Sequence, residues 1–438
     1  MGKIGNTISL IGHLLNVLAL DGVARDPARL RRYQERRLRA LVRHAYGRVP
    51  LYRRRFDAAG LRPDAIRGLD ELGRIPILSK RELREAPRRD ILADGLHPED
   101  CFLVETSGST GEPTGLYKDR NALLSLGAWT SPMNISRWVG RPAWRLMTLL
   151  VRHERTLEAG LVRSLPRFLL RVQEGDALAP PEDQLEMLNR ARPQLLITYP
   201  SVLRTLAVLV KERKAPVHQP AAIALSAEVF DAPTRRLAGE VFTTSTFVNA
   251  YGCTEAGLVA LECHQHRGLH VIGTRAIVEV LRDGRLAAPG EPGEVVVTDL
   301  TNFASPILRY AGLGDVAVWS PARCPCGRVL PLLEVIEGRR VDAFLLPDGR
   351  IVHPYHLTLA MEHIDGIHRY QIVQEARDRV RVLVVGPAGN GVGTRRAAAD
   401  ALGAILGAQV QIVVDGVEAI PAAPGEAAPR TVRSLVPR

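Results

Sequence analysis

The sequence has few cysteines, few aromatic residues and no long apolar run, and each shortage excludes a class of protein. Five cysteines in 438 residues are too few for a disulfide scaffold, and they predict a reducing, cytoplasmic location. Aromatic residues make up 5% of the chain, which disfavours the stacking surfaces of single-strand nucleic-acid binders. Polar residues interrupt the apolar N-terminal pattern, so we expect no stable membrane anchor. That segment predicts an amphipathic helix docked on the protein, with transient membrane contact as the alternative.

The charge of the chain is basic but diffuse. Lysine and arginine outnumber aspartate and glutamate by 58 to 47, which gives a formal charge of +11. Between Arg25 and Arg89 the arginines alternate with leucines, a pattern typical of the solvated face of amphipathic helices. This balance is compatible with nucleic acid, an anionic membrane or a polyanionic small molecule, but the diffuse spread favours a generally basic surface over a dedicated nucleic-acid stripe.

Alternating segments predict an α/β fold. Strands are expected at 145–151, 194–199 and 221–226, with a helix at 119–135 before them and helices at 181–191, 201–214 and 232–241 between and after them. This alternation indicates parallel α/β layers, whereas the Pro/Gly-rich stretch from Gly268 to Trp319 predicts an antiparallel subregion.

The chain is long enough for two or three domains. Strands at 369–374, 379–385 and 410–414 and a helix at 393–406 predict a small α+β C-terminal domain. We place a helical segment of the large domain at 1–90, the core at 91–341 and the small domain at 342–438. Leu345-Leu-Pro-Asp-Gly, just after the boundary, reads as a hairpin turn.

A Gly/Ser/Thr-rich stretch follows the strand expected at 101–105. Glycine lets backbone N–H groups converge, and hydroxyl groups add donors for phosphate oxygens. The Walker spacing is absent, and a flexible surface turn is the alternative interpretation. The phosphate-loop candidates are Thr106, Ser107, Gly108, Ser109, Thr110 and Gly111.

Four later stretches offer further nucleotide-binding chemistry. Asn249 to Glu255 combines an aromatic ring, a glycine turn and a carboxylate suited to Mg²⁺. Asp315 follows a glycine-rich turn and suits ribose hydroxyls. Glu337-Gly-Arg-Arg-Val-Asp342 supplies Arg339 for a ribose contact and a hinge, and Ser226 to Glu228 follow a buried strand.

In this order, the motifs resemble the adenylate-forming superfamily, and within it the phenylacetate–CoA ligase and capsule-biosynthesis branch. Thr106-Ser-Gly-Ser-Thr-Gly-Glu-Pro-Thr114 is similar to its phosphate loop, and Tyr251-Gly-Cys-Thr-Glu255 to its Tyr-Gly-x-Thr-Glu motif. Asp315 matches the ribose carboxylate, and Gly338-Arg339 with Asp342 matches the hinge. The resemblance extends from about Gln34 to the C-terminus.

The resemblance implies an ATP-dependent acid–thiol ligase whose small α+β C-terminal domain is mobile. A carboxylic acid, expected to be aryl or related, attacks ATP to give an acyl-adenylate, and CoA then displaces AMP. Implied cofactors are ATP, Mg²⁺ held by Glu255, and CoA, and a homodimer is also expected. Implied catalytic residues are Glu255, Thr254 and Arg430. Implied nucleotide contacts are the six loop residues with Ser226, Glu228, Asn249, Tyr251, Gly252, Asp315 and Arg339, and the acyl pocket has Tyr199, Ala227, Ala250 and Gly252.

Some positions depart from the family pattern. Ala428 stands where the family carries a late lysine, and the chain has no lysine after Lys214. Glu112 replaces a lysine in the phosphate loop, and the stretch before Asp315 has one extra residue. The alternatives are therefore a variant that uses a preformed adenylate or an acceptor other than CoA, and a non-catalytic nucleotide-binding homologue.

Cysteine and histidine also gather in two stretches that flank the antiparallel subregion. Their number suits a tetrahedral structural Zn²⁺, although Cys-x-Cys is a looser spacing than Cys-x-x-Cys. Some relatives in the branch have a zinc site in this region. The predicted ligands are Cys263, His270, Cys324 and Cys326, and the alternative is a set of reduced, unliganded thiols.

Overall fold

The computed structural model describes the chain except residues 1–2, 106–114, 141–145, 151–170, 178, 340–342, 353–356, 358–359, 362–363, 365, 368, 387–390, 421–430 and 437–438. Two compact units are distinguished. The first comprises Met1–Arg145, Glu154–Val172 and Val248–Val335, and the second Leu146–His153, Gln173–Phe247 and Ile336–Arg438. None of the helices in the described ranges combines the length and apolarity needed to cross a membrane.

The first unit opens with helices whose starts are set by proline and capping residues. Asp26 accepts hydrogen bonds from the N–H groups of Ala28 and Arg29, and Pro27 begins the helix behind it. The helices are α1 (Lys3–Val23), α2 (Pro27–Arg48), α3 (Pro50–Ala58), α4 (Lys80–Glu85), α5 (Arg88–Ile91), α6 (Arg120–Thr130) and α7 (Pro132–Trp138), with short 3₁₀ turns at Pro63–Ala65, Leu72–Arg74 and Pro98–Asp100.

The sheet of this unit has the strand order β11-β10-β12-β13-β14-β9-β8-β7. Its antiparallel pairs include β10 with β12 and β7 with β8. The strands are β7 (Thr246–Cys253), β8 (Gly257–Glu262), β9 (Leu269–Val271), β10 (Ala276–Arg282), β11 (Arg285–Leu286), β12 (Pro292–Asp299), β13 (Asp315–Trp319) and β14 (Leu332–Arg339). A separate hairpin pairs β1 (Phe102–Glu105) with β2 (Gly115–Lys118) on either side of residues 106–114.

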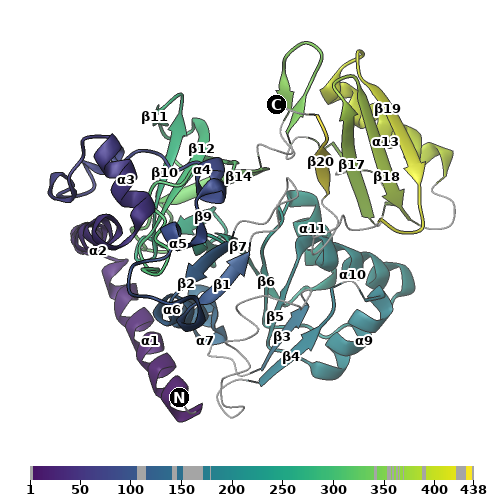
Figure 1. Cartoon of the computed structure of the whole chain (residues 1–438). Helices are drawn as coiled ribbons and strands as arrows, with labels where there is room; N and C mark the ends of the chain where they lie inside the picture. The colour runs from purple at the N-terminus through teal and green to yellow at the C-terminus, as the bar shows by residue number, and fades with distance from the viewer. Residues whose placement is uncertain are drawn as a thin grey trace. The chain divides into compact units, whose positions relative to one another are not determined.

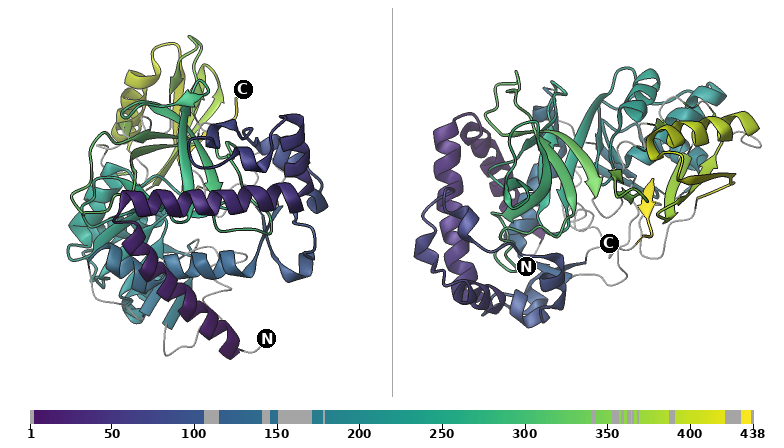
Figure 2. Two further views of the ribbon diagram at one scale, coloured as in Figure 1. Left: turned by 90° about the vertical axis from the view of Figure 1, so that its left-hand side faces the viewer. Right: turned by 90° about the horizontal axis from the view of Figure 1, so that it is seen from above.

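Helix α2 lies beside the antiparallel strands, and in the left view of Figure 2 it runs across their direction. Arg37 donates to the carbonyl of Leu300 at 2.6 and 3.2 Å, and Gln34 donates to that of Gly273 at 3.0 Å. Not every arginine of this helix lies on the expected solvated face, because Arg37 is partly buried and hydrogen-bonded to the backbone at Leu300.

The second unit contains the predicted parallel layer (Figure 1). Strands β3 (Leu146–Leu150), β5 (Leu195–Thr198) and β6 (Ala222–Leu225) are parallel neighbours, and β4 (Arg171–Gly175) follows β3 in the strand order. Helices α9 (Pro181–Ala191), α10 (Pro200–Arg213) and α11 (Ala232–Val241) share one apolar core with β5 and β6.

The C-terminal part of this unit forms a second core. Its sheet has the order β19-β18-β17-β20, with α13 (Val392–Leu406) packed against it. The strands are β17 (Arg369–Ala376), β18 (Arg379–Val385), β19 (Gln411–Gly416) and β20 (Val432–Ser434). Strands β15 (Phe344–Leu345) and β16 (Ile351–Val352) confirm the hairpin expected at Leu345-Leu-Pro-Asp-Gly.

The α/β class and the antiparallel subregion are confirmed. The single helix expected at 119–135 is wrong in detail, because Ser131 is extended (φ −62°, ψ 146°) and caps a second helix through Asn134 N–H. The hairpin formed by β1 and β2 was not anticipated. The domain boundaries at 90 and 341 stay a prediction.

Candidate nucleotide site and cysteine–histidine cluster

The Tyr-Gly-Cys-Thr-Glu motif forms the tip of the β7–β8 hairpin. Tyr251 pairs with Ala260 and Cys253 with Gly257, and the register shifts between Tyr251 and Gly252. A Cβ atom on Gly252 would lie 2.6 Å from the carbonyl oxygen of Gly257, so only glycine fits this bulge. Thr254 and Glu255 lie in the turn beyond it. The hairpin therefore fixes the spacing between the tyrosine ring and the carboxylate.

Tyr251 and Asp315, which are 64 positions apart, are joined by a hydrogen bond. The Tyr251 hydroxyl donates to Oδ2 of Asp315 at 2.6 Å. Asp315 begins β13 and is 9% exposed. Burial, and then the adjacent Asp315 carboxylate, raises the pKa of Tyr251 well above its usual value, so the phenol remains a donor. The predicted adenine and ribose residues thus lie side by side.

Glu255 is buried and is held at both ends. The Tyr310 hydroxyl donates to Oε1 of Glu255 at 2.9 Å, and the Lys118 ammonium donates to its backbone carbonyl. Lys118 also pairs with Asp299 at 3.3 Å. Sequence reasoning missed Tyr310, Lys118 and Asp299. The family's Arg-Tyr motif could have pointed to Tyr310, but no local signal marks Lys118 or Asp299.

Asn249 is fixed through its backbone. Its N–H donates to Oε2 of Glu262 at 2.8 Å, and Glu262 also pairs with Nδ1 of His266 at 3.1 Å. Ala250 pairs with Leu261 in the hairpin. The segment from Asn249 to Gly252, which carries predicted nucleotide and acyl contacts, is therefore anchored to Glu262, the residue before Cys263.

The remaining described candidates lie in the second unit. Ala227, between Ser226 and Glu228, has φ 69°, a left-handed conformation that costs a non-glycine residue energy. The Glu228 carboxylate accepts from both the N–H and the hydroxyl of Ser201 at 2.9 Å and so caps α10. Tyr199 precedes Pro200 at the start of that helix and packs on the core.

Several predicted residues lie outside the described part of the chain. They are Thr106, Ser107, Gly108, Ser109, Thr110 and Gly111 of the loop, Glu112, Ala428 and Arg430. Arg339 ends strand β14, and its side chain is not described.

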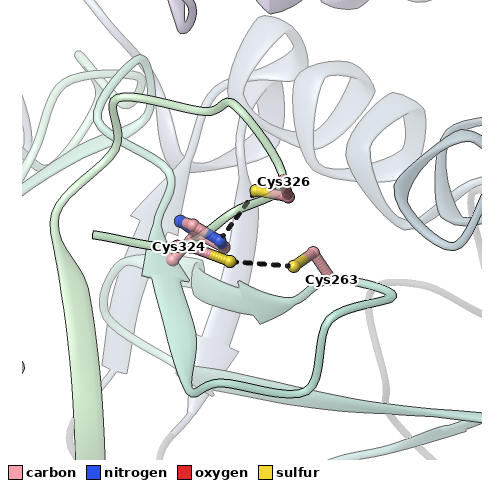
Figure 3. A group of neighbouring side chains, drawn as sticks. Cys263, Cys324 and Cys326 are labelled. Carbon is pink, nitrogen blue, oxygen red and sulfur yellow. Dashed lines mark hydrogen bonds between the residues drawn. The ribbon is translucent and has the colours of Figure 1, made fainter. Parts of the chain in front are cut away.

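The four predicted zinc ligands come together. Cys263 follows β8, His270 lies in the middle of β9, and the two other cysteines lie in the loop before β14. All four ligand atoms lie within 4.8 Å of one another. The Sγ atoms of Cys263 and Cys324 are 3.6 Å apart, and Sγ of Cys326 is 3.3 Å from Nε2 of His270. In Figure 3 the sulfur atoms of the three labelled cysteines point toward one another.

These distances fit a tetrahedral zinc ion. Zinc–ligand bonds of about 2.3 Å to sulfur and about 2.05 Å to nitrogen give edges of about 3.8 Å and about 3.6 Å. Burial lowers the pKa of His270 to about 4, so its imidazole is neutral, as a ligand must be. Burial raises the pKa of Cys263 to about 12, an environment that holds a thiolate only with a neighbouring cation.

The relationship to known proteins agrees with this geometry. The family model described as AMP-binding enzyme matches residues 29–304. The chain belongs to this family of adenylate-forming enzymes, as its motifs predicted.

Relatives define the branch. The phenylacetate–coenzyme A ligase of Thermus thermophilus is 30% identical over 357 residues, covering 79% of this chain and 78% of the relative. The Escherichia coli phenylacetate–coenzyme A ligase is 26% identical over 361 residues, with coverages of 78% and 79%. The predicted resemblance to the phenylacetate–CoA ligase branch is confirmed.

A solved structure supports the fold. A 2-hydroxyisobutyryl-CoA ligase, crystallised in the postadenylation state with 2-HIB-AMP, has a TM-score of 0.78 at 20% identity, covering 94% of this chain and 90% of that one. At this identity the match shows the adenylate-forming fold alone.

Proposed function

We propose that this protein activates a carboxylic acid, aryl or related, with ATP and transfers the acyl group to CoA. The observation that carries the proposal is the hydrogen bond between Tyr251 and Asp315 in a chain of this family. It joins the two motifs that the family uses for adenine and ribose. Relatives named phenylacetate–coenzyme A ligases support CoA as the acceptor and do not favour the alternatives of another acceptor or a non-catalytic homologue.

In this proposal, binding and orientation do most of the chemical work. Tyr251 flanks the adenine, Asp315 accepts from the ribose hydroxyls, and Asn249 is a further nucleotide contact. Ser226 and Glu228 are the nucleotide contacts proposed for the second unit. Tyr199, Ala227, Ala250 and Gly252 are the proposed contacts of the acyl group, and the three small residues among them suit a flat acid. The loop Thr106–Gly111 holds the β- and γ-phosphates, and Thr254 and Arg430 assist adenylation.

Glu255 is the proposed ligand for the Mg²⁺ of ATP. Its buried carboxylate is a hard oxygen donor, as that ion prefers. Bound Mg²⁺ would neutralise charge on the phosphates. Arg339 is proposed to contact ribose at the hinge, about which a small domain of residues 342–438 rotates between the two half-reactions.

The cluster of Cys263, His270, Cys324 and Cys326 is proposed to hold a structural zinc ion. Its distances and buried donors fit that metal. We also propose a cytoplasmic location, a carboxylic acid and a nucleotide as small-molecule partners without nucleic acid, and assembly as a homodimer.

ATP–pyrophosphate exchange with a panel of carboxylic acids tests the adenylation step. We expect exchange that depends on one acid class and on Mg²⁺, and that is lost in Glu255→Gln. An enzyme that binds ATP but exchanges with no acid would contradict the proposal.

A further inference from the structure

Glu255 is buried and is held by hydrogen bonds to both its carboxylate and its backbone. Its side chain is 6% exposed, and Tyr310 donates to Oε1 at 2.9 Å. This bond uses Oε1, so Oε2 is the carboxylate oxygen that we assign to a cation. The backbone carbonyl of the same residue accepts from Lys118. Both the orientation of the carboxylate and the position of its backbone are therefore set before any ligand binds.

Lys118 is an unusual donor because its ammonium group is buried. Its side chain is 6% exposed and that of its partner Asp299 is 1% exposed. A buried lysine keeps its charge only beside an opposite charge. Asp299 is held in turn by Thr301, whose N–H and hydroxyl donate to Oδ1 at 2.8 and 2.6 Å. These contacts hold the Lys118 ammonium in hydrogen-bond contact with the Glu255 carbonyl.

Three distant segments meet around Glu255: one bonds its carboxylate, one bonds its backbone carbonyl, and the third bonds the lysine of the second. Lys118 ends β2, the strand that leaves residues 106–114, and Asp299 ends β12. Tyr310 is bridged to Leu78 on one side and to Val297 on the other. The ammonium of the pair thus bonds the residue in the turn that carries the candidate metal oxygen.

We propose that Tyr310 and the Lys118–Asp299 pair are positioning residues that hold Glu255 in the geometry for the Mg²⁺ of bound ATP. This inference rests on the proposed function. It replaces none of the cations missing at Glu112 and Ala428, because Lys118 points at a backbone carbonyl. Its role is to remove the cost of ordering Glu255 when Mg·ATP binds.

Calorimetric titration with Mg·ATP, and with AMP in EDTA, separates positioning from folding. Two variants are compared with the wild type: Tyr310→Phe, and the double variant Lys118→Met/Asp299→Asn, which removes both charges so that neither stays buried alone. Their controls are Tyr370→Phe, a buried tyrosine in the other unit, and Lys211→Met/Glu240→Gln, an exposed pair.

We expect each test variant to bind Mg·ATP roughly tenfold or more weakly. Tyr310→Phe loses the hydrogen bond to the Glu255 carboxylate, and the double variant loses the hydrogen bond to the Glu255 backbone carbonyl. The Mg²⁺ concentration at half-saturation should rise, while AMP binding and both controls stay unchanged. Equal weakening of AMP and Mg·ATP, or no change in folded variants, would overturn the inference alone. A wild-type protein whose ATP binding ignores Mg²⁺ would overturn the proposed magnesium role with it.

Discussion

The buried pair of Arg309 and Glu279 gives the sharpest stability prediction. Arg309 donates from Nε and Nη2 to the two Glu279 carboxylate oxygens at 2.8 and 2.9 Å. Its Nη1 also donates to the carbonyls of Gly73 and Ile75 at 2.8 and 2.6 Å. Both side chains are less than a tenth exposed. The pair therefore connects the N-terminal helical segment to β10.

Glu279→Gln leaves the guanidinium buried without its counter-charge, and we expect it to destabilise the first unit by about 3–5 kcal/mol. Arg309→Met should cost a similar amount, and the double variant less than the sum because the partners are coupled. Trp129, Trp138 and Trp319 lie in this unit, so their fluorescence during urea unfolding reports on it.

The matched control is Glu240→Gln, which removes an exposed pair with Lys211 and should cost less than about 1 kcal/mol. A Glu279→Gln protein within about 1 kcal/mol of the wild type would refute the reasoning, since a buried unpaired charge cannot be that well tolerated.

Three further predictions concern the cluster, the helix cap and the hairpin. Metal analysis should find one zinc per chain, Cys324→Ser should lose it, and Cys101→Ser, at a cysteine outside the cluster, should keep it; a metal-free wild type with full stability would contradict the site. Burial raises the pKa of Glu228 above its ordinary 4.5, partly offset by Ser201 and Arg369 and reinforced by Asp231, so the folded state binds the proton more tightly than the unfolded one. Stability should therefore fall as pH rises above about 4.5, and Glu228→Gln should flatten that slope in urea titrations; an unchanged slope would argue against it. Gly252→Ala should distort the hairpin and weaken AMP binding at least about tenfold by displacing Tyr251. The control Gly239→Ala in α11, with no atom near its Cβ, should stabilise the folded protein by up to about 1 kcal/mol. Normal AMP binding in Gly252→Ala would show that the bulge tolerates a side chain.

The sequence pattern predicted those elements whose signals are local. Helix α11 and strand β18 have the predicted bounds, because a capping Asp231 and strict alternation mark their ends. Ser131 was missed as a helix breaker, since its capping role depends on one extended residue inside an apolar helical pattern.

The candidate site shows the same division. The four zinc ligands were predicted from residue type, because thiolates and imidazole have few other reasons to gather. Lys118 and Asp299 could not be predicted. The two partners of Lys118, which are Glu255 and Asp299, lie 137 and 181 positions away along the chain, and lysine is ordinarily exposed. Glu228 was predicted as a nucleotide contact, and nothing local shows that its carboxylate caps α10.

The most direct test of the account is to follow both products of the complete reaction. The protein is incubated with ATP, Mg²⁺, CoA and members of a panel of aryl and related carboxylic acids, and nucleotides and thioesters are quantified by chromatography with mass detection. An acyl-adenylating CoA ligase gives AMP and an acyl-CoA thioester in equal amounts, dependent on the acid and abolished by Glu255→Gln. Formation of ADP, or of AMP with no thioester for any acid, would contradict the proposed function.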